Sequence, residues 1–246
     1  MELRFETDKG LAHKAALGLI VLQADETIEN EFRPLFDLDG ITLNHTRIAS
    51  APEVTPETLM QMKSELAGTA SLLPSARALD VIGYGCTSAS TIIGSDAVAK
   101  AVRQAHPSAK VTNPAVAVLA ALNHLNAKKV GVVTPYIPEV SKAVVSLLED
   151  NGFAAVNVGS FGQSEEAVVA RISPASVKAA ICAVASDPEI DAVFASCTNL
   201  RTFPIIEDCE KILGKPVISS NSALAWHMMI LAGLPTNGRG PGRLYD

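Results

Sequence analysis

An internal repeat constrains this sequence more than any other feature. The segment LDVIGYGCTSAS, residues 79–90, is matched by IDAVFASCTNLR, residues 190–201, which places Cys86 and Cys197 111 positions apart. Two further pairs of segments recur in the same order at similar spacing: 17–32 with 130–145, and 109–125 with 215–231. Three matches in one order predict two similar halves related by an approximate two-fold axis.

Strand and helix patterns alternate along both halves. Short runs rich in β-branched residues and bounded by Gly, Pro or Ser predict eight strands, at 17–23, 41–48, 80–85, 110–113, 129–135, 154–160, 191–196 and 215–220. Between them, apolar residues recur every three or four positions, as in SKAVVSLLEDNG, which is typical of helices. This alternation predicts an α/β fold in which mainly parallel sheets are flanked by helices.

We therefore expect two αβ lobes related by pseudo-two-fold symmetry. Residues 1–116 together with 221–246 would form the lobe that carries Cys86, and residues 117–220 the lobe that carries Cys197. The active site is expected in the cleft between the two lobes, because open α/β sheets bind ligands beyond the carboxyl ends of their strands.

Composition and short motifs argue against several classes of function. The net charge is −6, Lys and Arg form no cluster, and aromatic residues make up only 4%, so no nucleic-acid partner is expected. No apolar run approaches 18 residues and the N-terminus has no signal-peptide pattern, so we expect no membrane association and a cytoplasmic location. CxxC, GxGxxG and HExxH motifs are absent, so no metal and no nucleotide cofactor are expected.

The chemistry is expected to reside in the repeated cysteines, Cys86 and Cys197. Each follows the carboxyl end of a predicted strand and precedes a helix, whose N-terminal N–H groups attract anions and are expected to lower a thiol pKa. The polar residues that follow are candidates for binding a carboxylate: Thr87, Ser88, Thr198 and Asn199. Two thiols on opposite sides of a substrate suit either the transfer of an α proton or addition to an activated double bond.

The remaining cysteines and two histidines are expected to stabilise the fold and not to take part in catalysis. Cys182 lies in the apolar helical segment VKAAICAVA and Cys209 in the helical segment IIEDCEKIL, and both are expected to be structural residues. His45 lies on a predicted strand and His227 in an apolar helix, and neither has a nearby Ser/Asp pair or metal-ligand spacing.

The segments GYGCTSAS, TPYIPEV and ASCTNLRTFP resemble motifs of the aspartate/glutamate racemase superfamily, above all the subgroup of maleate cis-trans isomerases and arylmalonate decarboxylases. VLQADETIE also looks like members associated with ectoine utilisation. The resemblance covers nearly the whole chain and implies chemistry without a cofactor in a homodimer or higher homo-oligomer. It further implies that Cys86 is a nucleophile, Cys197 a proton donor and acceptor, and Tyr136 a hydrogen-bond donor to a substrate carboxylate.

Two residues depart from the maleate isomerase pattern. Asp25 stands where those enzymes carry an asparagine that binds a carboxylate, and Glu166 stands where a second asparagine is expected. An acidic side chain would repel a dicarboxylate, so Asp25 favours a substrate ammonium or hydroxyl group. Both residues also have structural interpretations, Asp25 as a helix N-cap and Glu166 as part of a solvated helix start.

We therefore expect an isomerase or racemase that acts on a small carboxylate, either a dicarboxylate or an amino acid, through two opposed cysteines. The decarboxylases lack the partner cysteine at the position of Cys86, so its presence argues against simple decarboxylation. Two alternatives remain: a cofactor-independent decarboxylase or lyase with Cys197 as proton donor, and a two-lobed binding protein without catalysis.

Overall fold

The computed structural model describes residues 1–246 and contains two four-stranded sheets whose strands are all parallel. The first has the order β2-β1-β3-β4 and is built from β1 (Ala15–Leu22), β2 (Ile41–Ile48), β3 (Val81–Gly85) and β4 (Lys110–Thr112). The second has the order β6-β5-β7-β8 and is built from β5 (Lys129–Tyr136), β6 (Ala154–Gln163), β7 (Ala192–Ala195) and β8 (Val217–Ser219). Because the two orders are equivalent, the α/β architecture with two related lobes is confirmed.

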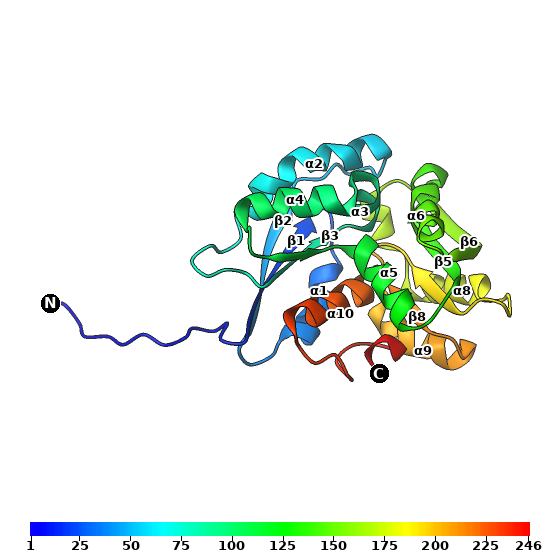
Figure 1. Ribbon diagram of the computed structural model, residues 1–246. Helices are drawn as coiled ribbons and strands as arrows, with labels where there is room; N and C mark the ends of the chain where they lie inside the picture. The colour runs from blue at the N-terminus through cyan, green and yellow to red at the C-terminus, as the bar shows by residue number, and fades with distance from the viewer.

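Helices cover both faces of each sheet. α2 and α4 lie on one face of the first sheet and α1 and α10 on the other, while α6 lies opposite α8 and α9 in the second half (Figure 1). Their bounds are α1 (Ile28–Phe36), α2 (Pro56–Ala70), α3 (Thr87–Ile93), α4 (Ser95–Ala105), α5 (Pro114–His124), α6 (Pro138–Asp150), α7 (Glu166–Val169), α8 (Pro174–Val184), α9 (Phe203–Leu213), α10 (Ser220–Ala232) and the 3₁₀ helix η1 (Arg243–Tyr245).

Burial explains the composition of the strands. All eight residues of β1 are buried, and in β5 only the first residue is not. Strands covered on both faces by helices need continuous apolar runs, which matches AALGLIVL and KVGVVTPY. The edge strands β2 and β6 are more exposed and more polar. The central strands therefore hold the site-bearing ends of the sheets in fixed positions.

The two halves exchange helices. α10 follows β8 of the second sheet but packs against β3 and β4 of the first, and α5, which follows β4, contacts both α10 and β8. The C-terminal residues contact both parts, since the Tyr245 hydroxyl donates to the Ser222 carbonyl oxygen at 2.8 Å and the Arg243 N–H donates to Glu210 of α9 at 2.9 Å. The exchange joins the halves tightly.

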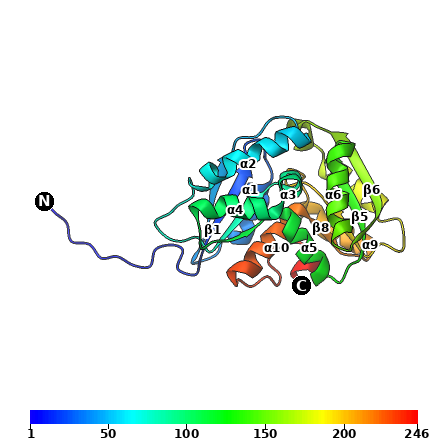
Figure 2. The ribbon, with the colours of Figure 1, turned by 45° about the horizontal axis from the view of Figure 1, so that its top comes forward.

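The N-terminal segment before β1 extends away from the body of the molecule (Figures 1 and 2). Its apolar side chains are exposed, with Leu3 at 70% and Phe5 at 84%. Elsewhere, no helix combines the length and the apolar character that a membrane span requires.

We expect Leu19→Ala to lower the free energy of unfolding by about 2–5 kcal/mol, because it removes a fully buried side chain from the central strand β1 and leaves a cavity. Urea denaturation measures the change. Leu3→Ala is the matched control, since the exposed Leu3 side chain should change stability by less than about 0.5 kcal/mol. Equal effects of the two substitutions would contradict this account of the core.

Candidate active site

Cys86 lies directly after β3 and caps the N-terminus of α3 with extended backbone angles. Its Sγ accepts a hydrogen bond from the Ala89 N–H at 3.4 Å and lies 3.6 Å from the Ser88 hydroxyl oxygen. The preceding Gly85 lets α1 pack closely against this strand end, because a Cβ there would approach Ile28 Cδ1 to 2.8 Å. The strand end and the helix start therefore fix the direction of this thiol.

Cys197 takes the equivalent place after β7 but has a different local geometry. Its φ of 153° lies in a region that residues other than glycine rarely adopt. A turn follows it and α9 begins only at Phe203, so the expectation of a helix immediately after this cysteine is wrong. The Cys197 Sγ nevertheless accepts a hydrogen bond from a backbone donor, the Asn199 N–H, at 3.3 Å.

A single serine hydroxyl links the two cysteine turns. Ser220 Oγ accepts a hydrogen bond from the Thr87 hydroxyl at 2.7 Å and another from the Cys197 N–H at 3.0 Å. In the reverse direction, the Thr198 hydroxyl donates to the Gly85 carbonyl oxygen at 3.4 Å. The residues next to each cysteine therefore contact the other turn. Ser220 did not figure among the sequence-based candidates, although it follows the carboxyl end of β8, where such residues are expected.

The structure gathers the candidate residues at this junction. Buried there are Cys86, Cys197, Asp25, Thr87, Ser88, Tyr136, Thr198 and Asn199. The Tyr136 hydroxyl lies near both sulfur atoms, since Cys197 and Cys86 each act on its pKa. This arrangement places one hydroxyl near both thiols, while the roles of these residues in catalysis stay predictions.

Asp25 lies just before α1 but is not its N-cap, which is Thr27, so that interpretation is wrong. Its Oδ1 accepts hydrogen bonds from the N–H groups of Thr27 and Ile28, at 2.8 and 2.9 Å. Its Oδ2 is buried and forms no hydrogen bond of normal geometry. The two bonds at the start of α1 therefore explain only one of the two carboxyl oxygens.

Glu166 is buried, so its interpretation as part of a solvated helix start is wrong. Asn199 Nδ2 donates to Glu166 Oε2 at 2.8 Å, and Asn199 Oδ1 accepts the Glu26 N–H at 2.9 Å. Burial, together with the nearby charge of Asp25, raises the pKa of Glu166 to about 7. The Glu166 carboxyl thus belongs to the site and titrates near neutrality.

Glu31 is a third buried carboxyl that the sequence analysis missed. Its Oε1 accepts the N–H groups of Thr202 and Phe203 at 2.7 and 2.9 Å, and its Oε2 accepts Asn221 Nδ2 at 2.7 Å. Burial raises the pKa of Glu31 to about 7. Glu31 joins α1 of the first half to the starts of α9 and α10, and its position on a helix face gave no signal of this.

Both thiols are held in the neutral form. Burial raises the pKa of Cys86 to about 12 and the pKa of Cys197 well above its ordinary value, and the charges of Glu166 and Asp25 raise both further. Hydrogen bonds from backbone N–H groups and from Tyr136 act in the opposite direction but are weaker. The expectation that helix N-termini lower these pKa values is therefore wrong, because desolvation outweighs the few donors.

Two loops pair with each other next to Glu166. The segment after β2 bonds to the segment before α7: the Val54 N–H donates to the Ser164 carbonyl oxygen at 2.7 Å, and the Glu166 N–H to that of Pro52 at 3.0 Å. We call this pairing the loop bridge; it spans the space between α2 and α6 in Figure 2. Cys86 and Cys197 are each only 3% exposed.

The residues with structural interpretations lie on other elements. Cys182 is half-buried in α8, and Cys209 is buried in α9. His227 of α10 hydrogen-bonds through Nδ1 to the Thr112 hydroxyl at 2.7 Å. His45 lies on the edge strand β2 and is exposed.

Comparison with known proteins shows the same architecture. The sequence pattern of the arylmalonate decarboxylase family matches residues 17–245. A maleate isomerase of Nocardia farcinica is 29% identical over 238 residues, which cover 93% of this chain and 94% of that protein. The crystal structure of the maleate isomerase Iso from Pseudomonas putida S16 has a TM-score of 0.86 and 26% identity, covering 94% of this chain and 98% of that one.

A further solved structure is informative about chemistry. The Nocardia farcinica maleate cis-trans isomerase was solved as a cysteine-to-serine mutant with a covalently bound succinylcysteine intermediate. Its TM-score is 0.85 at 28% identity, and the match covers 94% of this chain and 98% of that chain. In that protein, a cysteine forms a covalent bond to a substrate-derived group.

We expect Ser220→Ala to disturb the two cysteine turns, because it removes the acceptor shared by Thr87 and the Cys197 N–H and leaves two buried donors unpaired. The free energy of unfolding should fall by about 1–3 kcal/mol, measured by urea denaturation. Ser196→Ala is the matched control: the Ser196 hydroxyl is also buried but has no partner, so its removal should be neutral or stabilising. A smaller loss for Ser220→Ala than for Ser196→Ala would contradict the proposed link.

We expect iodoacetamide at pH 7 to label Cys182 before Cys86 and Cys197, because both site thiols are buried and have raised pKa values. Between pH 7 and 9 the labelling rate of Cys86 should rise about tenfold per pH unit without a plateau, since its pKa is about 12. Mass spectrometry of tryptic peptides gives the rates, and urea-unfolded protein is the control. A plateau for Cys86 below pH 9 would show that the thiol ionises more easily than this structure implies.

Proposed function

The chain belongs to the arylmalonate decarboxylase family, within the aspartate/glutamate racemase superfamily, and from this membership we propose that it is a cofactor-independent isomerase of a small carboxylate. The two opposed cysteines Cys86 and Cys197 would carry the chemistry. The observation that supports this most directly is the Ser220 hydroxyl, which ties the turn of one cysteine to the backbone of the other. Two thiols held at one buried junction suit a reaction that needs sulfur on both sides of a substrate.

Two related mechanisms fit this arrangement. In the first, one sulfur adds as a thiolate to the double bond of an unsaturated carboxylate, the resulting single bond rotates, and elimination restores the thiolate. In the second, one thiolate removes the α proton and the opposite thiol delivers its own proton to the other face. The succinylcysteine in the Nocardia farcinica relative supports covalent addition as the first mechanism to test.

The neighbouring side chains have defined parts in either mechanism. Cys86 would be the nucleophile and Cys197 the proton donor and acceptor, with the Tyr136 hydroxyl next to Cys197. Thr87, Ser88, Thr198 and Asn199 surround the thiols with hydroxyl, amide and backbone N–H groups. Donors of this kind stabilise the charge that develops on a substrate carboxylate in the transition state.

Decarboxylation is the second candidate, favoured by the name of the matching family. In that reaction, Cys197 alone would protonate the carbanion that remains after loss of carbon dioxide. Cys86, buried at the same junction and linked through Thr87 to Ser220, has no part in such a mechanism. Its placement supports the isomerase over the decarboxylase.

We also propose that the protein works in the cytoplasm as a homodimer or higher homo-oligomer. All four cysteines are free, including the half-buried Cys182. Free thiols are typical of reducing compartments. The oligomeric state is an expectation from the resemblance, and sedimentation analysis would establish it.

We expect Cys86→Ser and Cys197→Ser each to lower turnover by roughly 10²–10⁴-fold or more, because each removes a group needed on one side of the substrate. The assay follows isomerisation of unsaturated dicarboxylates and α-deuterium uptake by amino acids in D₂O by NMR. Cys182→Ser is the matched control and should keep full activity. If the Cys86→Ser protein still releases carbon dioxide, the decarboxylase is supported. If the native protein turns over neither the unsaturated dicarboxylates nor the amino acids, a binding protein is favoured.

A further inference from the structure

The two cysteine turns are held in different ways. Cys86 is fixed by the helix that it begins, because the Ser90 N–H donates to its carbonyl oxygen at 3.1 Å and the Ala89 N–H to its sulfur at 3.4 Å. The segment from Cys197 to Arg201 belongs to no helix or strand and takes part in no hydrogen bond between backbone groups. Buried backbone groups still need partners, so side chains must determine the shape of this turn.

Glu31 of α1 provides much of that support, although it comes from the other half of the molecule. Its Oε1 accepts the N–H groups of Thr202 and Phe203, at 2.7 and 2.9 Å, where the turn ends. Its Oε2 accepts Asn221 Nδ2 at 2.7 Å, and the same Nδ2 donates at 2.8 Å to the Thr198 carbonyl oxygen, where the turn begins. One carboxyl therefore holds both ends of the turn.

The residues at the start of α1 hold the middle of the same turn. The Glu26 N–H donates to Asn199 Oδ1 at 2.9 Å, and the Thr27 hydroxyl donates to the Asn199 carbonyl oxygen at 3.0 Å. The beginning of α1 and the Glu31 side chain thus form a template along the turn that follows Cys197. No equivalent template is needed at Cys86, where α3 follows at once.

The template matters because the Cys197 backbone is unfavourable by itself. Its φ of 153° is rare for any residue with a side chain, and such a conformation persists only where its surroundings determine it. The direction of the Cys197 Cα–Cβ bond, and so of its thiol, follows from that backbone. Loss of the template would let this thiol turn away while Cys86 keeps its place.

We propose that Glu31 is a positioning residue for Cys197, which it orients by holding the backbone turn of residues 198–203. This inference rests on the proposed function, because it assigns to Glu31 the orientation of the thiol that exchanges the proton. Glu31 acts on the reaction only through Cys197, since its hydrogen bonds reach the turn and not the sulfur atom.

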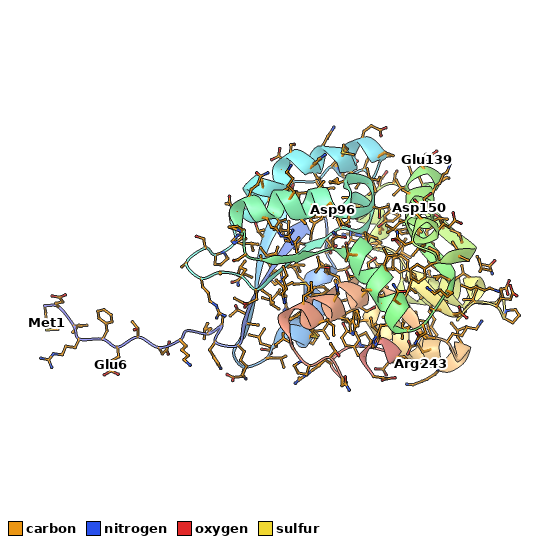
Figure 3. All side chains as sticks on the ribbon, in the orientation of Figure 1. Met1, Glu6, Asp96, Glu139, Asp150 and Arg243 are labelled. Atoms are coloured by element: carbon orange, nitrogen blue, oxygen red, sulfur yellow. The ribbon has the colours of Figure 1, made fainter.

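The test compares Glu31→Gln with Glu210→Gln. Glu210 is also buried and also accepts two backbone N–H groups, those of Val217 at 2.8 Å and Arg243 at 2.9 Å. Val217 lies at the amino end of β8, and the exposed Arg243 lies at the periphery of the molecule (Figure 3), so this carboxyl does not touch the cysteine turns. In either orientation, a glutamine amide directs an NH₂ group at a former donor. Both variants should therefore lower the midpoint of urea denaturation.

The first readout is the ratio of the iodoacetamide labelling rates of Cys197 and Cys86, measured by mass spectrometry. A general loss of stability exposes both thiols together and leaves this ratio unchanged. We expect Glu31→Gln to raise the ratio at least about tenfold, as loss of a hydrogen bond to a charged group allows, and Glu210→Gln to leave it unchanged. Asn221→Ala keeps the charge of Glu31 and should raise the ratio as well, so it serves as the second variant if Glu31→Gln does not fold.

The second readout is turnover in the assay of the native protein. Glu31→Gln should lower kcat at least about tenfold with a smaller change in KM, because a displaced Cys197 slows proton transfer more than binding. The solvent isotope effect on kcat in D₂O should increase, since proton transfer then limits the rate. Glu210→Gln should keep the native kcat and isotope effect.

The inference is overturned if the labelling ratio stays unchanged in both Glu31→Gln and Asn221→Ala, or if Glu210→Gln raises it equally. It is also overturned if an active protein keeps its native kcat in Glu31→Gln. The proposed function fails separately: native protein that turns over no substrate, with a raised ratio in Glu31→Gln, would keep the hold of Glu31 on Cys197 and remove the isomerase.

Discussion

The arrangement of this molecule depends on polar contacts that cross between its two halves, above all the hydroxyl of Ser220. A duplicated fold produces two similar strand ends, but it does not by itself bring them together. Here the Thr87 hydroxyl and the Cys197 N–H share one acceptor, and Glu31 binds the starts of α9 and α10 from the other half. Because all these groups are buried, each contact is expensive to break, and the two thiols keep one relative position.

The same burial determines the chemical state of the site. Removing Cys86 and Cys197 from water favours the thiol over the thiolate, and the nearby carboxyls strengthen that preference. The resting protein is therefore protected from oxidation and alkylation, whereas catalysis requires a local change in charge.

The sequence was sufficient for the architecture and for finding a set of candidate residues that the structure brings to one junction. The 111-residue repeat of Cys86 and Cys197 predicts equivalent strand ends, and β1 to β8 follow the expected runs closely, because strands covered on both faces have an unmistakable apolar pattern. Ser220, Glu31 and the burial of Glu166 were not predictable in this way, since each depends on packing between segments far apart in the chain. The predicted direction of the thiol pKa shifts was wrong for the same reason. The sequence indicates where helices begin, but it does not show how completely the two thiols are removed from water.

The loop bridge has a consequence for how the site is held together. The N–H that Glu166 donates to Pro52 is part of the bridge, while the carboxyl of the same residue accepts from Asn199 in the turn of Cys197. One residue therefore joins a surface loop to the surroundings of a buried sulfur atom. A substitution in either loop would change the position of that carboxyl as well as the path of the backbone.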